Sequence, residues 1–168
     1  MKTLYIIGGT MGIGKTIVCR QLQKKLNNCV FLDGDWCWDM RPFTVTEETK
    51  AMVLENICHL LNNFLGCSAY ENILFCWVLH EQSILDDILS RLNTDNCRLL
   101  CISLLCSPEA LTERLNKDIS AGLRQPDVLP RSLARIPLYQ KLNTIKIDVS
   151  WLSAEEAAEE ILHLPLSK

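Results

Sequence analysis

The sequence predicts an α/β fold in which a mostly parallel, doubly wound sheet is covered by helices on both faces. Several short runs are apolar throughout rather than alternating, which is typical of strands buried on both sides. Segments whose apolar residues recur at helical spacing separate these runs. The chain has 168 residues, with no repeat and no proline- or serine-rich linker, so residues 1–168 are expected to form one domain.

The strands and helices follow from these runs in order. Each expected strand is a continuous apolar stretch, and each is separated from the next by a segment that fits a helix. The expected strands are residues 4–7, 29–32, 73–79, 99–105 and 144–149. The expected helices are residues 15–27, 46–64 and 81–93, one beginning at 107–109, one ending near 141 and one beginning at 153.

Three of these helices carry start signals. Thr46 precedes two first-turn glutamates as an N-cap should. Ser107-Pro108-Glu109 combines a cap, an N1 proline and an N-terminal acid. Ser153-x-x-Glu156 is a capping box.

Residues 9–16 match G-x-x-x-x-G-K-[ST], the phosphate-binding P-loop, and lie between a strand and a helix as that motif requires. The glycines let backbone N–H groups turn toward phosphate oxygens, and the helix N-terminus adds partial positive charge. Lys15 is predicted to reach the β- and γ-phosphates of ATP, and the Thr16 hydroxyl to bind Mg²⁺. The predicted nucleotide-binding residues are Gly9, Thr10, Met11, Gly12, Ile13, Gly14, Lys15, Thr16 and, outside the loop, Arg114.

The second expected strand ends in Asp33-Gly34-Asp35. In an extended chain, residues two apart point the same way, so both carboxylates are expected to face the P-loop. Asp33 is predicted to lie on the metal side, and Asp35 to accept the proton of an attacking hydroxyl. A polar Asp-Gly turn without a catalytic role is the alternative.

The third expected strand ends at Leu79-His80-Glu81, so the aspartate of an ordinary Walker B strand is missing. Either Glu81 or the Asp33/Asp35 pair then supplies the metal-side carboxylate, and we favour the pair. His80 is interpreted as a polar residue that leads into a helix, with substrate contact as the alternative.

Four of the eight arginines fall between positions 114 and 135. They surround residues 118–131, which contain one glycine and two prolines and are predicted to form a short mobile lid. Such a loop can close over a polyphosphate and neutralise charge that develops during transfer. Arg124 is the first candidate for this catalytic role and Arg114 the second, while a solvated surface segment is the alternative.

The acceptor-binding segment is expected between residues 35 and 90. Histidines aside, it has only two basic side chains after Asp35, Arg41 and Lys50, which favours a neutral or weakly charged acceptor that presents a hydroxyl. Trp77 lies in the middle of an expected strand and is interpreted as a core residue. Trp36 and Trp38 follow the acid pair and are predicted to contact the substrate, with core packing as the alternative for both. The predicted substrate contacts are Asp35, Trp36, Trp38 and Arg41, the last of which could hold an acidic group.

Composition narrows the partners and the location. A net charge of −3 argues against nucleic acid and anionic membranes as partners. No stretch approaches the roughly 20 apolar residues of a membrane span, and the N-terminal run is interrupted at Gly8, so the expected location is the cytoplasm. Nine cysteines without a C-x-x-C are interpreted as reduced core thiols, with Cys37 set apart because it follows the acid pair.

The P-loop, the Phe31-Leu32-Asp33-Gly34-Asp35 segment and the arginine-bearing lid together resemble the small-molecule kinases of the nucleoside-monophosphate-kinase-like group, such as gluconate kinase, shikimate kinase and chloramphenicol phosphotransferase. The resemblance covers the whole chain in layout and the first 40 residues in specific motif. It implies a three-layer P-loop NTPase fold with five parallel strands in the order 2-3-1-4-5, with residues 118–131 as the lid.

Three functional hypotheses follow. The first is an ATP- and Mg²⁺-dependent kinase that acts on a hydroxyl of a small molecule, with Lys15, Asp35 and Arg124 as catalytic residues. The second is an ATP-binding regulatory or switch module with slow hydrolysis, which the missing Walker B aspartate favours. The third is a nucleoside or nucleotide kinase, which would need a strongly basic acceptor pocket. No N-K-x-D motif is present, which points to ATP rather than GTP.

Overall fold

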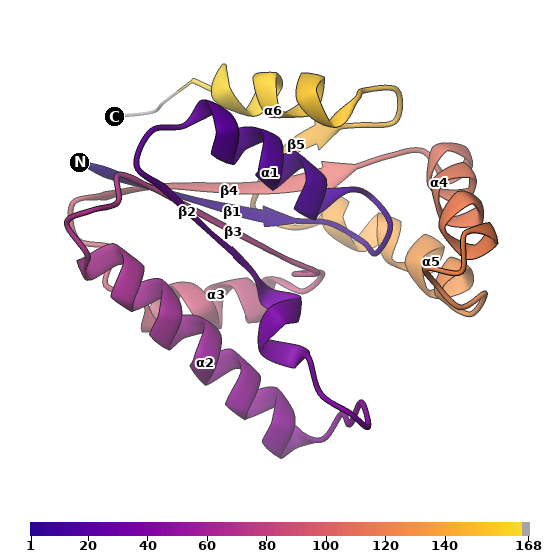
Figure 1. Cartoon of the computed structure of the whole chain (residues 1–168), viewed down its shortest axis with the longest axis horizontal. Helices are drawn as coiled ribbons and strands as arrows, with labels where there is room; N and C mark the ends of the chain where they lie inside the picture. The colour runs from indigo at the N-terminus through magenta and orange to yellow at the C-terminus, as the bar shows by residue number, and fades with distance from the viewer. Residues whose placement is uncertain (166–168) are drawn as a thin grey trace.

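A computed structural model, which describes residues 1–165, contains one sheet of five parallel strands in the order β2-β3-β1-β4-β5. The predicted fold class and strand order are therefore confirmed. The central strand lies between β3 and β4, and the sheet twists across the molecule (Figure 1). The strands are β1 (Lys2–Gly8), β2 (Cys29–Asp33), β3 (Asn72–Trp77), β4 (Cys97–Leu105) and β5 (Ile145–Asp148).

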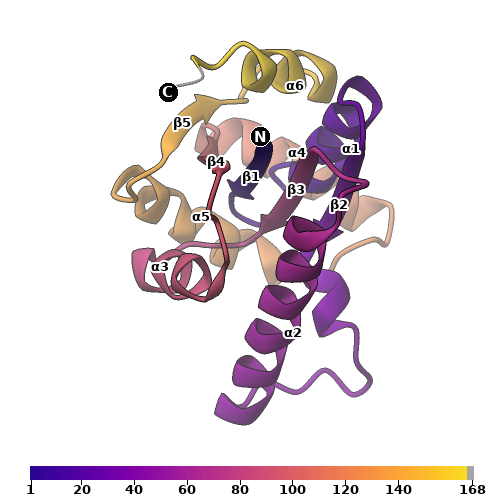
Figure 2. The same cartoon turned by 90° about the vertical axis from the view of Figure 1, so that its left-hand side faces the viewer.

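Helices cover both faces of this sheet (Figure 1 and Figure 2). One face carries α1 (Lys15–Lys25) and α6 (Ala154–Leu162), and the other carries α2 (Glu47–Gly66) and α3 (Gln82–Arg91). Two more helices, α4 (Pro108–Ser120) and α5 (Val128–Gln140), pack together, and α4 lies beyond the carboxyl end of the sheet (Figure 1). A short 3₁₀ helix, η1 (Gly34–Trp38), joins β2 to the segment that leads into α2.

The core consists of one apolar cluster on each face, and β1 contributes to both. Tyr5 and Ile7 pack with α1, α4 and α6, whereas Leu4 and Ile6 pack with α2 and α3. All four side chains are buried, which explains why residues 4–7 of this strand are all apolar instead of alternating.

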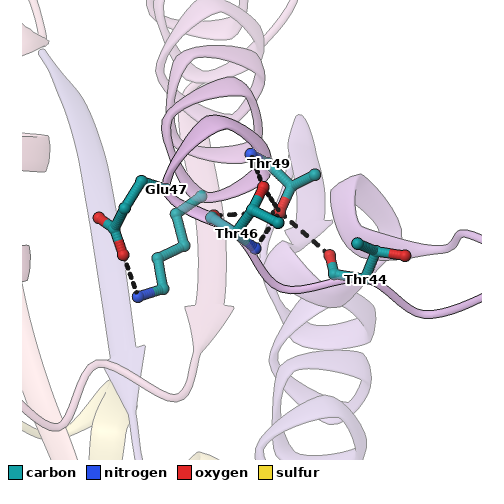
Figure 3. Close-up of polar contacts among 5 residues, drawn as sticks. Thr44, Thr46, Glu47 and Thr49 are labelled. Atoms are coloured by element: carbon teal, nitrogen blue, oxygen red, sulfur yellow. Dashed lines mark hydrogen bonds and ion pairs between the residues drawn. The ribbon is translucent and has the colours of Figure 1, made fainter.

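The predicted helix starts are confirmed. Ser107 and Ser153 each cap their helix, and Ser153 forms a capping box with Glu156. Thr46 caps α2 in a capping box with Thr49, whose hydroxyl also donates to the Thr44 carbonyl over 3.0 Å (Figure 3). These bonds fix the direction in which the chain enters α2.

The third strand is shorter than the sequence predicts. It ends at Trp77, and Leu79 adopts a left-handed backbone conformation with φ of 36°. Leu79 remains buried after the chain has turned. The apolar run therefore continues past the end of the strand, and its last residues form a turn.

The predicted loop at residues 118–131 is also shorter in the structure. Helix α4 continues to Ser120 and α5 begins at Val128, so the α4–α5 loop comprises residues 121–127. Pro130 does not exclude a helix here because it lies in the first turn, where backbone N–H groups have no helical partner.

None of the helices within residues 1–165 is both long and apolar enough to cross a membrane. The nine cysteines are unpaired, and Cys37 packs against the apolar cluster under α2. No group of three potential metal-ligating side chains that includes cysteine or histidine occurs within the same residues.

Candidate active site

A pocket of about 410 Å³ lies at the carboxyl end of the sheet, between the P-loop, α4 and the start of α6. Its lining combines charged side chains with apolar ones. Four cations and two carboxylates line it, so the pocket is locally positive although the chain is acidic. Its lining residues are Met11, Gly12, Ile13, Gly14, Lys15, Thr16, Ile17, Val18, Asp35, Arg114, Lys117, Asp118, Arg124, Val149, Leu152, Ser153, Ala154 and Ala157.

The P-loop forms the floor of this pocket. Gly12 has φ of 82°, and a Cβ there would lie 2.3 Å from Leu115 Cδ2, so this position requires glycine both for its backbone and for its space. Gly14 precedes α1 without a side-chain cap, which leaves the first N–H groups of the helix for a ligand. Gly9 and Thr10 lie outside the pocket lining, and Thr10 is buried.

Lys15 supplies the central cation. Its ammonium donates to the Thr10 carbonyl over 3.1 Å, and no carboxylate within residues 1–165 lies within ion-pair distance of it. Burial lowers the pKa of Lys15 below its ordinary value, and nearby Cys76, Asp35 and Asp33 offset only part of this shift. A partly buried cation without a carboxylate partner is suited to an anionic ligand.

Thr16 and Asp33 meet at one point. The Thr16 hydroxyl donates to Asp33 Oδ2 over 2.6 Å, and Asp33 is buried at the end of β2. A hydroxyl and a carboxylate are hard oxygen donors of the kind that Mg²⁺ prefers. The chemistry of this pair therefore fits the predicted metal site.

Asp35 reaches the pocket by a different route from the one predicted. The chain does not remain extended after Asp33 but turns into η1, and Asp33 Oδ1 accepts a hydrogen bond from the Asp35 backbone N–H over 3.1 Å. The turn arises because the side chain of Asp33 caps the 3₁₀ helix. Asp35 still lines the pocket beside Lys15 and Thr16.

The environment of Asp35 shifts its pKa upward. Partial burial is the main cause, even though the residue remains accessible at the pocket wall, and the nearby Asp33 carboxylate adds to it. Lys15, a hydrogen bond from the Trp77 side chain and Arg124 act in the opposite direction. A raised carboxylate pKa is typical of a general base.

Trp77 lies outside the pocket lining but next to the turn that carries Asp35, so its interpretation as a core residue is incomplete. Its ring is only partly buried and lies so close to Gly34 that a Cβ on Gly34 would be 2.5 Å from Trp77 Cγ. Pairing of β1 with β3 sets Trp77 level with Gly8, next to the start of the P-loop. Trp77 thus holds the chain between the two aspartates in position.

Arg114 joins three segments around the pocket. Its guanidinium donates to the carbonyls of Ile13, over 3.1 Å, and of Val149 and Ser150. The P-loop and the β5–α6 connection are therefore both fastened to α4. Arg124, from the α4–α5 loop, lines the same pocket and pairs with Asp118 at 2.9 Å.

Three of the predicted substrate contacts lie outside the pocket lining. Trp36 packs edge-on against Phe31 with a centroid distance of 5.2 Å, beneath the Arg20 guanidinium. Trp38 packs 5.8 Å from the ring of Phe43 and against the cluster under α2. Arg41 is exposed in the segment that leads into α2.

Glu81, the alternative to Asp33 on the predicted metal side, lies apart from Thr16. It precedes α3 and pairs with His80 at 3.3 Å, outside the pocket that contains Thr16. Burial and the nearby Arg135 lower the pKa of His80, and its Nδ1 is buried without a hydrogen-bond partner in the described part of the chain. The strand-end carboxylate of this site therefore comes from β2.

Sequence reasoning did not identify the apolar part of the pocket lining. Val149, Leu152, Ala154 and Ala157 form it, from the end of β5 and the first turns of α6. The signal was present, because β5 ends at the same edge of the sheet as the P-loop strand, where ligands of parallel sheets bind.

Comparisons with known proteins identify a family and a fold. The model of the AAA domain matches residues 6–124, and no curated protein matches the chain in sequence. A gluconokinase from Sinorhizobium meliloti 1021 has a similar structure, with TM-score 0.70 and 19% identity over 95% of this chain and 89% of its own. The tunicamycin resistance protein of Deinococcus radiodurans follows at TM-score 0.68 and 16% identity, with 99% and 98% covered.

A shikimate kinase from Acinetobacter baumannii, solved with shikimate, has TM-score 0.61 and 22% identity over 98% of this chain and 92% of its own. At these identities the matches establish the fold, which is the α/β P-loop kinase fold that the resemblance implies. The family match spans well over half of the sequence and includes the P-loop, both aspartates and Arg124. The chain therefore belongs to the AAA domain family of P-loop proteins.

Proposed function

We propose that the protein is an ATP-dependent phosphotransferase that moves the γ-phosphoryl group of Mg-ATP to a hydroxyl of a small molecule. The observation that carries this proposal is that Lys15, Thr16 and Asp35 line one positive pocket, while the buried Asp33 accepts a hydrogen bond from Thr16. This grouping contains both a metal-binding pair and a separate carboxylate with a raised pKa. A nucleotide switch has no need of the second carboxylate.

The pocket lining offers apolar surface for the base of ATP and charged groups for its phosphates. The apolar surface formed by Leu152 and Ala154 suits the base, and the P-loop suits the phosphates. Thr16 and Asp33 would hold Mg²⁺, which supplies charge neutralisation at the phosphate oxygens when bound. Lys15 would exchange the Thr10 carbonyl for phosphate oxygens, because a charged acceptor makes the stronger hydrogen bond.

The acceptor would approach from the side of Asp35. Its hydroxyl proton passes to the Asp35 carboxylate as the hydroxyl oxygen attacks, and Trp77 keeps that carboxylate oriented. Arg124 can leave Asp118 for the transferred group, since their ion pair is partly exposed and therefore weak. Catalysis in this scheme consists of positioning and charge stabilisation.

The test is ADP formation from Mg-ATP across a panel of sugar acids, nucleosides, nucleotides and phenolic or aminocyclic antibiotics. Asp35→Asn should keep ATP affinity and lose acceptor-dependent ADP formation. Asp39→Asn is the matched control, because it removes an exposed carboxylate four residues away, outside the pocket. ATP binding without acceptor dependence would instead favour a regulatory module, and activity on nucleosides or nucleotides alone would favour that class of kinase.

A second variant tests the nucleotide site itself. Lys15→Ala should weaken ATP binding, because it removes the cation that lies closest to the phosphates in this scheme. Isothermal titration calorimetry with ATP and with adenosine separates the phosphate contribution from that of the base. Equal ATP affinity in the variant and the wild type would refute the assigned role of the P-loop.

A further inference from the structure

The P-loop is fastened to both helices that flank the α4–α5 loop. From α4, Arg114 donates to the Ile13 carbonyl over 3.1 Å, and Leu115 fills the space beside Gly12. From α5, the Ser132 carbonyl accepts a hydrogen bond from the Thr10 hydroxyl over 3.0 Å. The arginine-bearing loop thus extends from two stems that are both tied to the phosphate-binding loop.

The Thr10–Ser132 bond is buried. Thr10 is 1% exposed and Ser132 is 0% exposed, so water does not compete for this bond. The Thr10 side chain therefore points into α5 instead of into the pocket, although Thr10 is a P-loop residue. The hydroxyl of Ser132 has no partner within residues 1–165, so the contact uses only the backbone of that residue.

The same Thr10 peptide accepts the hydrogen bond of Lys15, over 3.1 Å, through its carbonyl. A phosphate group competes with this carbonyl for the Lys15 ammonium. Occupation of the P-loop therefore changes the bonding of the residue whose side chain holds α5.

Helix α5 is held at a second point, two turns further along the same face. The Tyr139 hydroxyl donates to the Val78 carbonyl, just beyond the end of β3. The helix therefore connects the P-loop to the strand end next to Trp77, on the acceptor side of the site.

We propose that Thr10 is a positioning residue that couples occupation of the phosphate site to α5. The Thr10 hydroxyl holds Ser132 so that α5 and the arginine-bearing loop are set relative to the bound phosphates. The inference rests on the proposed nucleotide site and deepens it, because it assigns a route between the nucleotide side and the acceptor side.

Hydrogen exchange of the amides of residues 128–140, with and without saturating Mg-ADP, tests the coupling without knowledge of the acceptor. In the wild type, Mg-ADP should slow this exchange by about tenfold, a change of the size that one buried hydrogen bond supports. Thr10→Val keeps the shape and removes the donor. It should bind Mg-ADP within about threefold of the wild type and lose most of the slowing.

Two further variants separate coupling from packing. Thr10→Ser retains the donor and should retain the slowing of exchange. Ser132→Ala removes the unpartnered hydroxyl but keeps the accepting carbonyl, so it should also retain the slowing. If Thr10→Val does not fold, Thr10→Ala, which removes the hydroxyl without placing a methyl group against the Ser132 carbonyl, takes its place.

Once an acceptor is known, Thr10→Val should lower kcat by about tenfold and leave the KM for ATP within about threefold. Full slowing of exchange in Thr10→Val, or equal loss in Thr10→Val and Ser132→Ala, would overturn the proposal. So would a wild type in which bound Mg-ADP leaves α5 unchanged, whatever transfer activity it has. If Mg-ADP slows the exchange but the protein phosphorylates no hydroxyl compound, the coupling through Thr10 is supported and the kinase proposal is refuted. If Mg-ADP does not bind, both proposals are refuted.

Discussion

The Thr16 hydroxyl and the Asp33 carboxylate are joined over 2.6 Å, so the first turn of α1 and the end of β2 already converge on one point. The other oxygen of Asp33 accepts from the backbone of Asp35. One buried aspartate therefore organises both the metal side of the site and the turn that presents the candidate base.

Asp33→Asn should separate metal binding from nucleotide binding. The amide is similar in shape to the carboxylate but lacks its charge, so the affinity for ATP without metal should stay close to that of the wild type. The enhancement of ATP affinity by Mg²⁺ should fall by about tenfold to a hundredfold. Calorimetric titrations with and without Mg²⁺ measure it, with Asp39→Asn as control; an undiminished enhancement would assign the metal to another residue.

The activity should have an acidic limb set by Asp35. Partial burial first and Asp33 second raise the pKa of Asp35, and a general base must be ionised. We therefore expect kcat to fall as pH is lowered through a pKa above the ordinary aspartate value of about 3.9. Trp77→Phe removes a hydrogen bond that lowers this pKa, so it should move the limb to higher pH. The limb is measured as kcat at saturating substrate. If it stays at the same pH in Trp77→Phe, Asp35 is not the group that accepts the proton.

Asp35→Asn should stabilise the protein at neutral pH while it abolishes transfer. Because the folded state raises the pKa of Asp35, it binds the proton more tightly than the unfolded chain does. Ionised Asp35 thus destabilises the fold above its folded pKa, and the effect vanishes as pH falls below the ordinary value. The residue is accessible, so the gain in Tm at pH 7 should be small, about 1–2 °C. Thermal unfolding at pH 7 that favours the wild type would reverse the sign of this argument.

Arg114→Ala should destabilise the fold as well as the nucleotide site. The change removes the guanidinium donor from the carbonyls of Ile13, Val149 and Ser150, of which that of Val149 keeps the Leu152 N–H. We expect a loss of about 1–3 kcal/mol in the free energy of unfolding, measured in urea. Arg131→Ala is the matched control, since Arg131 forms an exposed pair with Asp127, and it should change stability by less than about 0.5 kcal/mol. Similar losses in both variants would mean that the bonds of Arg114 contribute nothing specific.

Gly34→Ala should disturb the site by overpacking. The added methyl group would lie 2.5 Å from Trp77 Cγ, so the ring or the turn must move, at a cost of about 1–3 kcal/mol. Activity should fall with stability, because Asp35 is the next residue. Gly66→Ala is the control: it has open space around its Cβ and lies at the end of α2, so it should be neutral or slightly stabilising. Unchanged kcat in Gly34→Ala would show that the Trp77 contact does not position Asp35.

Local patterns in the sequence were sufficient for the sheet, the P-loop and the helix starts. Strands such as β1 contain a continuous apolar run because the sheet buries both faces, and this pattern is visible without coordinates. The strand order came from the resemblance of the chain to known kinases, since periodicity alone does not order parallel strands. The approach of Asp33 to Thr16 follows from the local patterns together with the strand order. Asp33 ends one element, and Thr16 lies in the first turn of a neighbouring one.

The remaining features depend on contacts between distant residues. Trp77 reads as a mid-strand core residue until Gly34 is seen against its ring, 43 positions away in the chain. Trp36 and Trp38 follow the acid pair closely, but the 3₁₀ turn directs them toward Phe31 and Phe43. Sequence proximity to Asp35 therefore does not bring these two side chains into the pocket lining, and their contact with a substrate stays a prediction.

The segment that leads into α2 is almost free of the core. Every buried residue of that helix lies at Val53 or beyond, residues 41–48 are all exposed, and the start of the helix projects from the body of the molecule in both views (Figure 1 and Figure 2). Substitutions and insertions there sacrifice little folding free energy. If the proposed acceptor contacts lie in this segment, acceptor preference can diverge in one stretch of the gene while the P-loop is inherited unchanged, and directed evolution of new substrates would begin there.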